Sequence, residues 1–340
     1  MRFRVAYLDR PMNEAFLTTA ASHPTLEVVR IPPGEPEEVI AALASCHGYY
    51  VMASRQELPT ALHVSPALLA RLPGLLMVAS YGAGYDTIDV AACTAAGVLA
   101  VNQAGGNAEG VAEHALGLIL LLLKRVPEAW AAMRAGAVGP RDAFLGRELV
   151  GRTVGLVGLG HVGTRMATLL HVFGCRVLAV DPALDAAACA ARGAEKVTLP
   201  ELLAASDIVS LHCPLAPDTR GMIGPEALGA MRSGAILVST ARGGIVDEPA
   251  LLDALNSGHL AGAGLDVWVD EPPPREHPLL SHPAVLGSPH TAGVTTESRA
   301  RVASMAAEAF AAAVTDLPPR LLNPEAAPAF RFRRTAVLKG

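Results

Sequence analysis

Three ionisable residues in the second half of the chain are of the types that could bind and reduce a small keto acid: Arg242, Glu271 and His290. An arginine guanidinium binds a carboxylate through two parallel hydrogen bonds. An imidazolium can give its proton to a carbonyl oxygen as a hydride arrives, and a carboxylate beside it orients the ring and raises its pKa. Beside a nicotinamide cofactor, this set predicts reduction of a 2-keto acid. A buried ion-pair network is the structural alternative.

A glycine-rich segment predicts where such a cofactor binds. Gly158, Gly160 and Gly163 form a G-x-G-x-x-G between an apolar strand and a helical stretch, and a second strand ends in Asp181, 18 residues after the last glycine. The glycines permit, in order, a tight turn, the approach of a pyrophosphate and close packing of the helix on the strand. An acid at this position binds the ribose hydroxyls and repels a 2′-phosphate, which favours NAD over NADP. His161, at the start of the helix, lies near the pyrophosphate or faces solvent.

Composition and length exclude several classes of protein. The chain has 340 residues, of which 51% are hydrophobic and 17% are charged, so it is not a disordered chain and is long enough for two domains. A net charge of −5 makes nucleic acid an unexpected partner. The longest apolar run, 115–123, is too short to span a bilayer. Five cysteines without a C-x-x-C pair, and no signal-peptide pattern, favour a reduced, cytoplasmic protein without a metal or disulfide framework.

Short apolar strands alternate with helical segments, which predicts an α/β fold with parallel sheets. One set of strands is expected at 4–8, 26–30, 48–52, 75–79 and 98–102, and another at 153–157, 176–180, 207–212, 235–240, 262–265 and 284–287. Helical segments are expected at 108 to about 134 and at about 295 to 314. The second set of strands is complete before the last helix, so that helix is expected to return to the first domain. The basic tail at 331–334 is expected to be solvated and poorly ordered.

The sequence resembles the D-isomer-specific 2-hydroxyacid dehydrogenases, a family that includes glyoxylate/hydroxypyruvate reductases and phosphoglycerate dehydrogenases. The matching stretches cover nearly the whole chain: 80–89, 107–114, the glycine motif, 212–215, 240–244, 265–268, 271–272 and 289–293. The resemblance implies a Rossmann domain that binds NAD, a discontinuous flavodoxin-like substrate domain, and an active-site cleft between them. The expected divisions are 1–103 and 295–340 for the substrate domain and 104–294 for the NAD-binding domain, through which a homodimer is expected.

The resemblance also implies roles for single residues. His290 is expected to be the general acid/base, Glu271 its partner, and Arg242 the group that binds the substrate carboxylate and carbonyl. Backbone N–H groups at Tyr81 and Gly82 are expected to hold the same carboxylate. No metal site is expected. The implied cofactor contacts are Val111, Gly158, Gly160, His161, Val162, Gly163, Asp181, Pro214, Thr219, Thr240, Ala241, Arg242, Asp266, His290 and Gly293.

Two departures from the family pattern give further expectations. Tyr81 stands where a small aliphatic residue is more usual, and we expect its ring to narrow the mouth of the pocket. The segment 55–63 is longer than the usual loop. We expect it to cover the substrate, with a solvated loop as the alternative. His114 and His212 are interpreted as structural.

Two other functions compete with a keto-acid reductase. One is an NAD-sensing binding protein without activity, like the corepressors of this superfamily. The other is a sister enzyme that oxidises formate or phosphite, against which Glu271 argues, because formate dehydrogenases have glutamine there. Glyoxylate, hydroxypyruvate, phosphoglycerate and branched or aromatic keto acids all fit the motifs.

Overall fold

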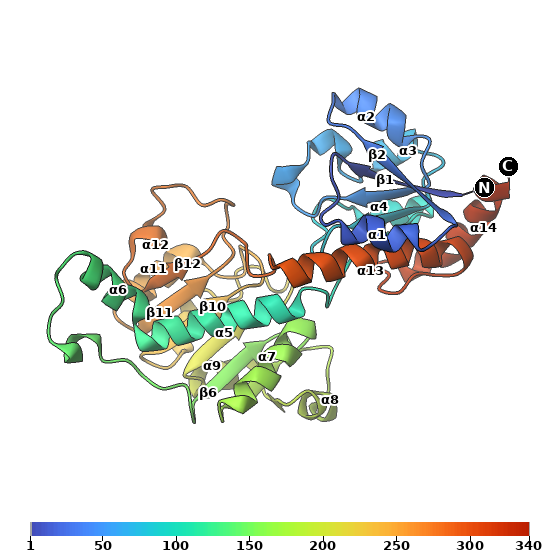
Figure 1. Ribbon diagram of the computed structural model, residues 1–340. Helices are drawn as coiled ribbons and strands as arrows, with labels where there is room; N and C mark the ends of the chain where they lie inside the picture. Colours follow the sequence, from blue (N-terminus) through green and yellow to red (C-terminus); the bar gives the residue numbers. More distant parts are fainter. Residues whose placement is uncertain (1, 340) are drawn as a thin grey trace. The chain divides into compact units, whose positions relative to one another are not determined.

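A computed structural model describes residues 2–339 and shows two compact units, each with its own parallel sheet (Figure 1). Unit 1 contains the chain up to Asn107 and again from Val294, and unit 2 contains Ala108–Gly293. The sequence analysis placed these divisions after residues 103 and 294. None of the helices within residues 2–339 is both long enough and apolar enough to cross a membrane.

Unit 1 is built on a five-stranded parallel sheet in the order β2-β1-β3-β4-β5. This is the flavodoxin-like order. Strand β2 is added on one side of β1, and β3, β4 and β5 are added on the other, so the switch point lies between β1 and β3. The predicted flavodoxin-like α/β unit is therefore present. Its strands are β1 (Phe3–Leu8), β2 (Leu26–Ile31), β3 (Gly48–Val51), β4 (Met77–Ser80) and β5 (Leu99–Val101).

Both faces of this sheet are buried under helices. Along β1, Phe3, Val5 and Tyr7 enter one hydrophobic core, and Ala6 and Leu8 enter the other. The alternation follows from the two-residue period of a strand. The first core lies under α1 (Ala15–Ala21), α13 (Thr296–Thr315) and α14 (Ala327–Lys339), and the second under α2 (Pro36–Leu43), α3 (Pro66–Arg71) and α4 (Val90–Ala96).

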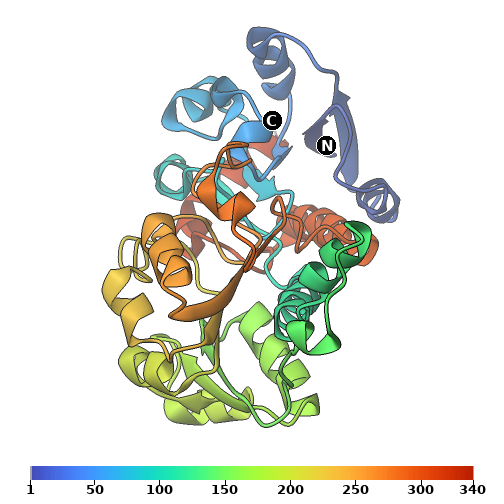
Figure 2. The same ribbon diagram turned by 90° about the vertical axis from the view of Figure 1, so that its left-hand side faces the viewer.

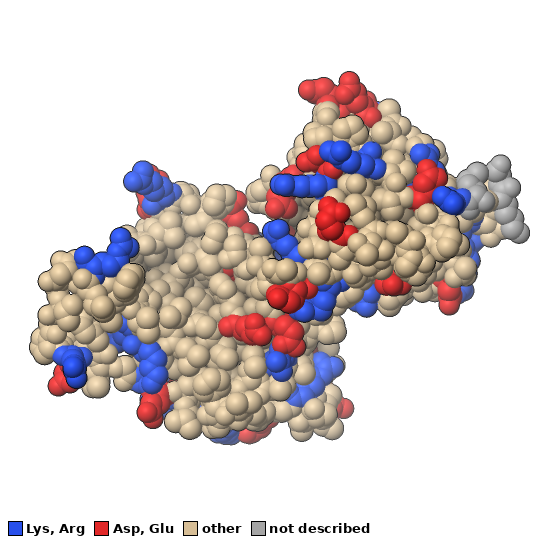
Figure 3. All heavy atoms as spheres, in the orientation of Figure 1, with Lys and Arg blue, Asp and Glu red and all other residues tan. Residues whose placement is uncertain are grey.

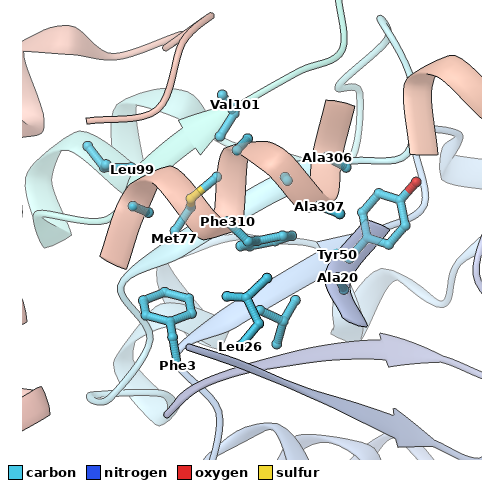
Figure 4. Close-up of a cluster of buried hydrophobic side chains, with 14 of the residues drawn as sticks. Phe3, Ala20, Leu26, Tyr50, Met77, Leu99, Val101, Ala306, Ala307 and Phe310 are labelled. Atoms are coloured by element: carbon cyan, nitrogen blue, oxygen red, sulfur yellow. The ribbon is translucent and has the colours of Figure 1, made fainter. Parts of the chain in front are cut away.

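Helix α13 returns to the first sheet, as the sequence predicts, and makes unit 1 discontinuous. Its Phe310 side chain is fully buried. Figure 4 shows the Phe310 ring among Phe3, Leu26 and Met77. A Cβ atom on Gly48 would lie 2.7 Å from the ring, so glycine is what lets the ring lie against β3.

The prediction of a poorly ordered tail at 331–334 is wrong, because residues 327–339 form helix α14. The sequence shows a basic run at 331–334 but not the contacts that the run makes. Phe330 is fully buried against the first core. The Arg333 guanidinium donates hydrogen bonds to the carbonyl groups of Pro73, Ala96 and Gly97. These carbonyls lie at or just beyond the C-terminal ends of α3 and α4, where helical partners are lacking, so the arginine satisfies them.

Unit 2 has a seven-stranded parallel sheet in the order β12-β11-β10-β9-β6-β7-β8. This is the Rossmann order with one added strand, and it reverses direction between β6 and β9. Figure 2 shows helices on both sides of the sheet. The two-residue strand β8 was missed, because its residues are charged and exposed. The strands are β6 (Thr153–Val157), β7 (Arg176–Val180), β8 (Glu195–Lys196), β9 (Ile208–Leu211), β10 (Ala235–Ser239), β11 (Leu260–Leu265) and β12 (Val285–Gly287).

The helix expected at 108 to about 134 is two helices. α5 (Ala108–Lys124) ends before Arg125, whose φ is 52°, and α6 (Val126–Arg134) begins after it. Pro127 has no N–H to donate back to the carbonyl of Leu123. That carbonyl accepts a hydrogen bond of 2.8 Å from the N–H of Arg147 instead. The break therefore follows from the proline.

Helices α5 and α7 (His161–Val172) cover one face of the second sheet. The other face is covered by the helices that follow its later strands. These include α9 (Leu199–Ala205), α10 (Pro225–Ala230), α11 (Glu248–Asn256) and α12 (Pro278–Ser281), while α8 (Ala186–Ala191) precedes β8.

Candidate active site

The three glycines between β6 and α7 each meet a different physical demand. Gly158 has a φ of 95°, a conformation that L side chains rarely adopt. A Cβ on Gly163 would lie 2.1 Å from the carbonyl oxygen of Gly158, so the helix packs against the turn only without a side chain. A Cβ on Gly160 would meet nothing within 4 Å. The turn therefore leaves open space at the N-terminus of α7, where free N–H groups suit a pyrophosphate.

Asp181 follows β7 and is aligned by the backbone of the same turn. Its Oδ2 accepts a hydrogen bond of 2.9 Å from Leu159 N–H, and its Oδ1 accepts one of 3.0 Å from Ala183 N–H. Each carboxylate oxygen has a further lone pair for a ribose hydroxyl. His161 is exposed at the start of α7 and Val162 is half-buried beside it. Arg192, which no motif in the sequence indicates, also holds this turn, because its guanidinium donates to the Leu159 carbonyl at 2.7 Å.

Thr219 shapes the turn after β9. Its hydroxyl donates to the carbonyl of Pro214 at 2.7 Å and accepts from the N–H of Ala216 at 2.7 Å. The turn therefore owes its shape to a side chain that the sequence analysis assigned to the cofactor. Two other predicted contacts have buried side chains. Val111 lies in the first turn of α5, and Ala241 lies two residues after the end of β10.

His212 is a structural histidine, as predicted. Its ring nitrogens lie 2.9 Å from Ser210 Oγ and 3.4 Å from Thr240 Oγ1, so the predicted cofactor residue Thr240 is tied to it. Burial lowers the pKa of His212 to about 4, which keeps the ring neutral at physiological pH.

The His290 imidazole and the Glu271 carboxylate form a direct pair. His290 Nδ1 donates to Glu271 Oε2 at 2.7 Å, and Glu271 Oε1 accepts from the N–H of Trp268 at 3.1 Å. The hydrogen bond to Glu271 raises the pKa of His290 above its usual value, although burial and the nearby Arg242 act against it. The His290 side chain remains 41% exposed. The bond uses Nδ1 and leaves the other ring nitrogen, Nε2, for a ligand.

Burial alone would raise the pKa of Glu271. The hydrogen bond and the positive charge of His290 outweigh this effect, with help from the Trp268 N–H and from Arg242, so the pKa of Glu271 is lowered. The two shifts have the same cause, because each charged form stabilises the other. The pair therefore favours an imidazolium beside a carboxylate.

Asp266 holds the turn that carries His290. His290 has a φ of 54°, an uncommon conformation for a residue with a side chain. Its N–H donates to the Asp266 carbonyl at 2.8 Å. The Asp266 carboxylate, which is 1% exposed, accepts from Thr291 N–H at 2.7 Å and from Ala292 N–H at 3.0 Å. Asp266 is among the cofactor contacts that the family resemblance implies, and the structure adds a backbone role that no spacing indicates.

Ser288 and His114 complete the surroundings of Asp266. Ser288 Oγ donates to Asp266 Oδ1 at 2.6 Å and lies 2.9 Å from His114 Nε2. A carboxylate accepts hydrogen bonds only, so the serine hydroxyl must in turn accept from the histidine. This arrangement agrees with the structural interpretation of His114.

Arg242 follows β10 and is half-buried. Its Nη1 donates to the carbonyl of Ala241 at 2.8 Å. A Cβ on Gly243 would lie 1.7 Å from the carbonyl oxygen of Trp268, so the Arg242 segment and the Glu271 segment touch backbone to backbone. Three neighbouring strands, β10, β11 and β12, thus carry Arg242, Glu271 and His290 beyond their carboxyl ends, where open α/β sheets bind ligands.

The loop at Tyr81 and Gly82, in unit 1, differs from its prediction. The N–H of Tyr81 donates to the carbonyl of Val51 at 2.8 Å and so continues the sheet rather than facing a ligand. The Tyr81 ring is 6% exposed, and its hydroxyl donates to the Arg10 carbonyl at 3.0 Å. The expectation that the ring narrows a pocket mouth is wrong, because the ring packs in the first core. A Cβ on Gly82 would meet nothing within 4 Å, so the loop is open there.

The segment 55–63 is held against unit 1 at several points. Leu58 and Leu62 are buried in the second core of that unit. Arg55 Nε donates to the carbonyl of Asp86 at 2.7 Å. Two short 3₁₀ turns, Arg55–Glu57 and Thr60–Leu62, shape the segment. The expectation that it covers the substrate stays a prediction.

Comparison with known proteins gives consistent relatives. Residues 116–292 match the family model described as D-isomer specific 2-hydroxyacid dehydrogenase, NAD binding domain. The D-3-phosphoglycerate dehydrogenase of Mycobacterium leprae is 39% identical over 291 residues, covering 86% of this chain and 53% of that protein. The chain therefore spans about half the length of the curated relatives that it matches.

Two solved structures cover nearly the whole chain. The TT0316 protein from Thermus thermophilus is 32% identical with a TM-score of 0.78, covering 94% of this chain and 99% of that one. The D-lactate dehydrogenase from Aquifex aeolicus, solved with NAD and lactic acid, is 27% identical with a TM-score of 0.75. That match covers 91% of this chain and 94% of the other.

The His290–Glu271 pair gives a testable titration. In Glu271→Gln the imidazolium loses its charged partner, so we predict that the pKa of His290 falls. An NMR titration of the histidine ring signals measures it, with the distant His259 ring as internal control. A His290 pKa that does not move would show that the carboxylate does not set it.

Proposed function

Because the chain belongs to the D-isomer-specific 2-hydroxyacid dehydrogenase family, we propose that it is an NAD-dependent oxidoreductase acting on D-2-hydroxy acids and 2-keto acids. The observation that carries the proposal is the 2.7 Å hydrogen bond between His290 Nδ1 and Glu271 Oε2. A general acid needs a pKa near the working pH, and a carboxylate partner raises the pKa of an imidazole. An NAD-sensing protein without activity has no need of such an acid.

The residues divide the work according to their chemistry. Bound NAD(H) supplies or accepts the hydride, and the turn at Gly158–Gly163 with Asp181 would hold it. The Arg242 guanidinium binds the substrate carboxylate in a two-bond fork. His290 Nε2 gives a proton to the carbonyl oxygen during reduction and removes it from the hydroxyl during oxidation. Glu271 keeps the ring in one orientation and stabilises its charged form, while Asp266 holds the backbone beneath it.

The substrate class follows from these roles. The side chain of the substrate has to be determined by assay. We propose 2-keto acids with a free carboxylate, including glyoxylate, hydroxypyruvate and larger acids. The relatives named for D-3-phosphoglycerate and D-lactate put the phosphorylated hydroxy acid and pyruvate on the same panel. The carboxylate partner of His290 argues against formate or phosphite oxidation, because those reactions need no proton transfer at a carbonyl oxygen. Oxidation of NADH on mixing with the keto acids, and reduction of NAD on mixing with D-3-phosphoglycerate, are the direct tests.

We predict that His290→Ala lowers turnover about 10²–10⁴-fold, the range for loss of a general acid. NADH affinity should change little, because the glycine turn and Asp181 are untouched. His282→Ala, which removes a histidine of the same unit outside this pair, serves as control. Turnover of His290→Ala within threefold of the native protein would remove the proton-transfer role. A native protein that binds NADH but reduces no keto acid would favour the sensing alternative.

We propose NAD rather than NADP as the cofactor, because Asp181 would repel a 2′-phosphate. In Asp181→Ala, the ratio of NADPH to NADH affinity should rise, since the repulsion and the ribose hydrogen bonds are both lost. Binding titrations with both cofactors measure the ratio. Asp185→Asn removes an exposed carboxylate four residues away and should leave the ratio unchanged. A native preference for NADPH would contradict the assignment.

We propose a homodimer formed through unit 2. Six large apolar side chains between the end of α5 and residue 145 are each more than a third exposed, and Figure 3 shows few charged side chains over α5. Clustered exposed apolar groups are typical of interaction surfaces. A pocket of about 320 Å³ lies beside them, at the amino end of the sheet and away from His290. The six residues are Leu121, Val126, Trp130, Met133, Val138 and Leu145.

We predict that Trp130→Glu yields monomers at concentrations where the native chain is dimeric, because a buried unpaired carboxylate opposes association. Sedimentation velocity measures the state. Val172→Glu changes an even more exposed apolar residue, at the end of α7, and should leave the dimer intact. A monomeric native chain would contradict the proposal. We also propose a cytoplasmic location, which the five free thiols favour and cell fractionation checks.

A further inference from the structure

One carboxylate holds both ends of the loop that carries Glu271. Glu248 Oε1 accepts a hydrogen bond of 2.8 Å from the N–H of Val269, and Glu248 Oε2 accepts one of 3.1 Å from His277 Nε2. The side chains of His277 and Glu248 are only 19% and 12% exposed. Hydrogen bonds to a largely buried carboxylate are stronger than surface ones. The ends of the loop at 269 and 277 are therefore joined through Glu248.

The same carboxylate connects the loop to the segment that carries Arg242. Glu248 is the first residue of α11 and stands six residues after Arg242. Between them, Gly243 lies against the backbone of Trp268 so closely that a Cβ would reach 1.7 Å from its carbonyl oxygen. The segments after β10 and β11 are thus joined at two places, once by backbone packing and once by Glu248.

Trp268 passes this anchoring on to the acid/base pair. Its backbone N–H donates to Glu271 Oε1 at 3.1 Å, and its indole Nε1 donates to the Ser288 carbonyl at 3.0 Å, two residues before His290. The indole is buried and meets the His277 ring edge-on, with 5.7 Å between ring centroids. A displacement of Val269 or His277 would therefore reach Glu271 through Trp268.

We propose that Glu248 and His277 are positioning residues, which hold the Glu271 loop so that its carboxylate meets His290 Nδ1. The inference rests on the proposed oxidoreductase function and adds two residues to its machinery. The charged groups that act on the His290 ring are Glu271, Arg242 and Asp266. Glu248 makes its hydrogen bonds to Val269 and His277 and not to the His290 ring, so its proposed influence acts through the loop.

The direction of the His277–Glu248 hydrogen bond decides which His277 variants test the proposal. A carboxylate only accepts, so His277 Nε2 carries the proton. His277 Nδ1 is buried without a partner among the described residues. A flip of the ring would break the hydrogen bond from Nε2 to Glu248 and leave Nε2 unsatisfied as well. His277→Phe removes the donor and keeps an aromatic ring beside Trp268. His277→Gln keeps an N–H donor at nearly the same reach and is the conservative variant.

The experiment measures kcat/KM for keto-acid reduction by NADH as a function of pH. In His277→Phe we expect kcat/KM to fall about 10–100-fold, as a small misplacement of a catalytic group can cause. Reduction needs the imidazolium, so activity is lost as pH rises through the pKa of His290. A loosened Glu271 lowers that pKa, and the alkaline limb should move to lower pH. NADH affinity should stay unchanged, and His277→Gln should restore most of the native profile.

Matched variants separate positioning from general loss of stability. His259→Phe removes another half-buried histidine of unit 2, whose Nε2 lies 3.1 Å from the Leu228 carbonyl, and should leave the pH profile in place. In a Glu271→Gln background, His277→Phe should add no further shift, because the group through which it acts is gone. If His277→Phe does not fold, Glu248→Gln carries the same test.

An NMR titration of the His290 ring keeps this inference distinct from the proposed function. A fall in the pKa of His290 in His277→Phe supports the positioning role even if no keto acid is reduced, an outcome that would overturn only the proposed reaction. An unchanged pKa and an unchanged pH profile in a folded His277→Phe protein would overturn the positioning role and leave the reaction standing.

Discussion

The buried carboxylate of Asp266 accepts hydrogen bonds from the backbone of the turn that carries His290. Burying an ionised carboxylate is costly unless its lone pairs are satisfied, and here Thr291, Ala292 and Ser288 satisfy them. These hydrogen bonds also hold His290 at a positive φ. That conformation costs about 1–3 kcal/mol for a residue with a side chain. Each feature supports the other, because a buried carboxylate needs hydrogen-bond donors and a strained backbone needs a fixed acceptor. The His290–Glu271 pair is built on this mutual support.

The parallel sheet of unit 2 explains why distant residues meet at one site. Neighbouring parallel strands end at the same edge, so the segments after β10, β11 and β12 lie side by side although 48 residues separate Arg242 from His290. Two glycines are needed for this approach. Gly243 admits the Trp268 backbone, and Gly287 admits the indole, which a Cβ would meet at 2.7 Å. Trp268 thus touches all three segments, and its size makes it the common support of the site.

The electrostatics of the pair depend on what surrounds it as much as on the pair itself. Glu271 raises the pKa of His290, while Arg242 lowers it. The same guanidinium that is suited to bind a substrate carboxylate therefore opposes the charge on the acid. Neutralising Arg242 with a bound carboxylate would weaken that opposition, so binding of an anionic substrate should itself favour the protonated ring.

The sequence sufficed for features that depend on neighbours along the chain. The glycine motif, the acid after β7 and the strand cores follow from backbone sterics and from the two-residue period of strands, so both sheets were predicted, and only the charged strand β8 was missed. The three ionisable residues were identified by type and by their place after strands. Tertiary structure decided what each polar group does. The Tyr81 N–H belongs to the ladder with Val51, the basic tail becomes a helix because Arg333 finds free carbonyls, and His277 meets Glu248 from 29 residues away. Such partners cannot be inferred from local sequence, because a hydrogen bond between distant segments depends on the packing that brings them within reach.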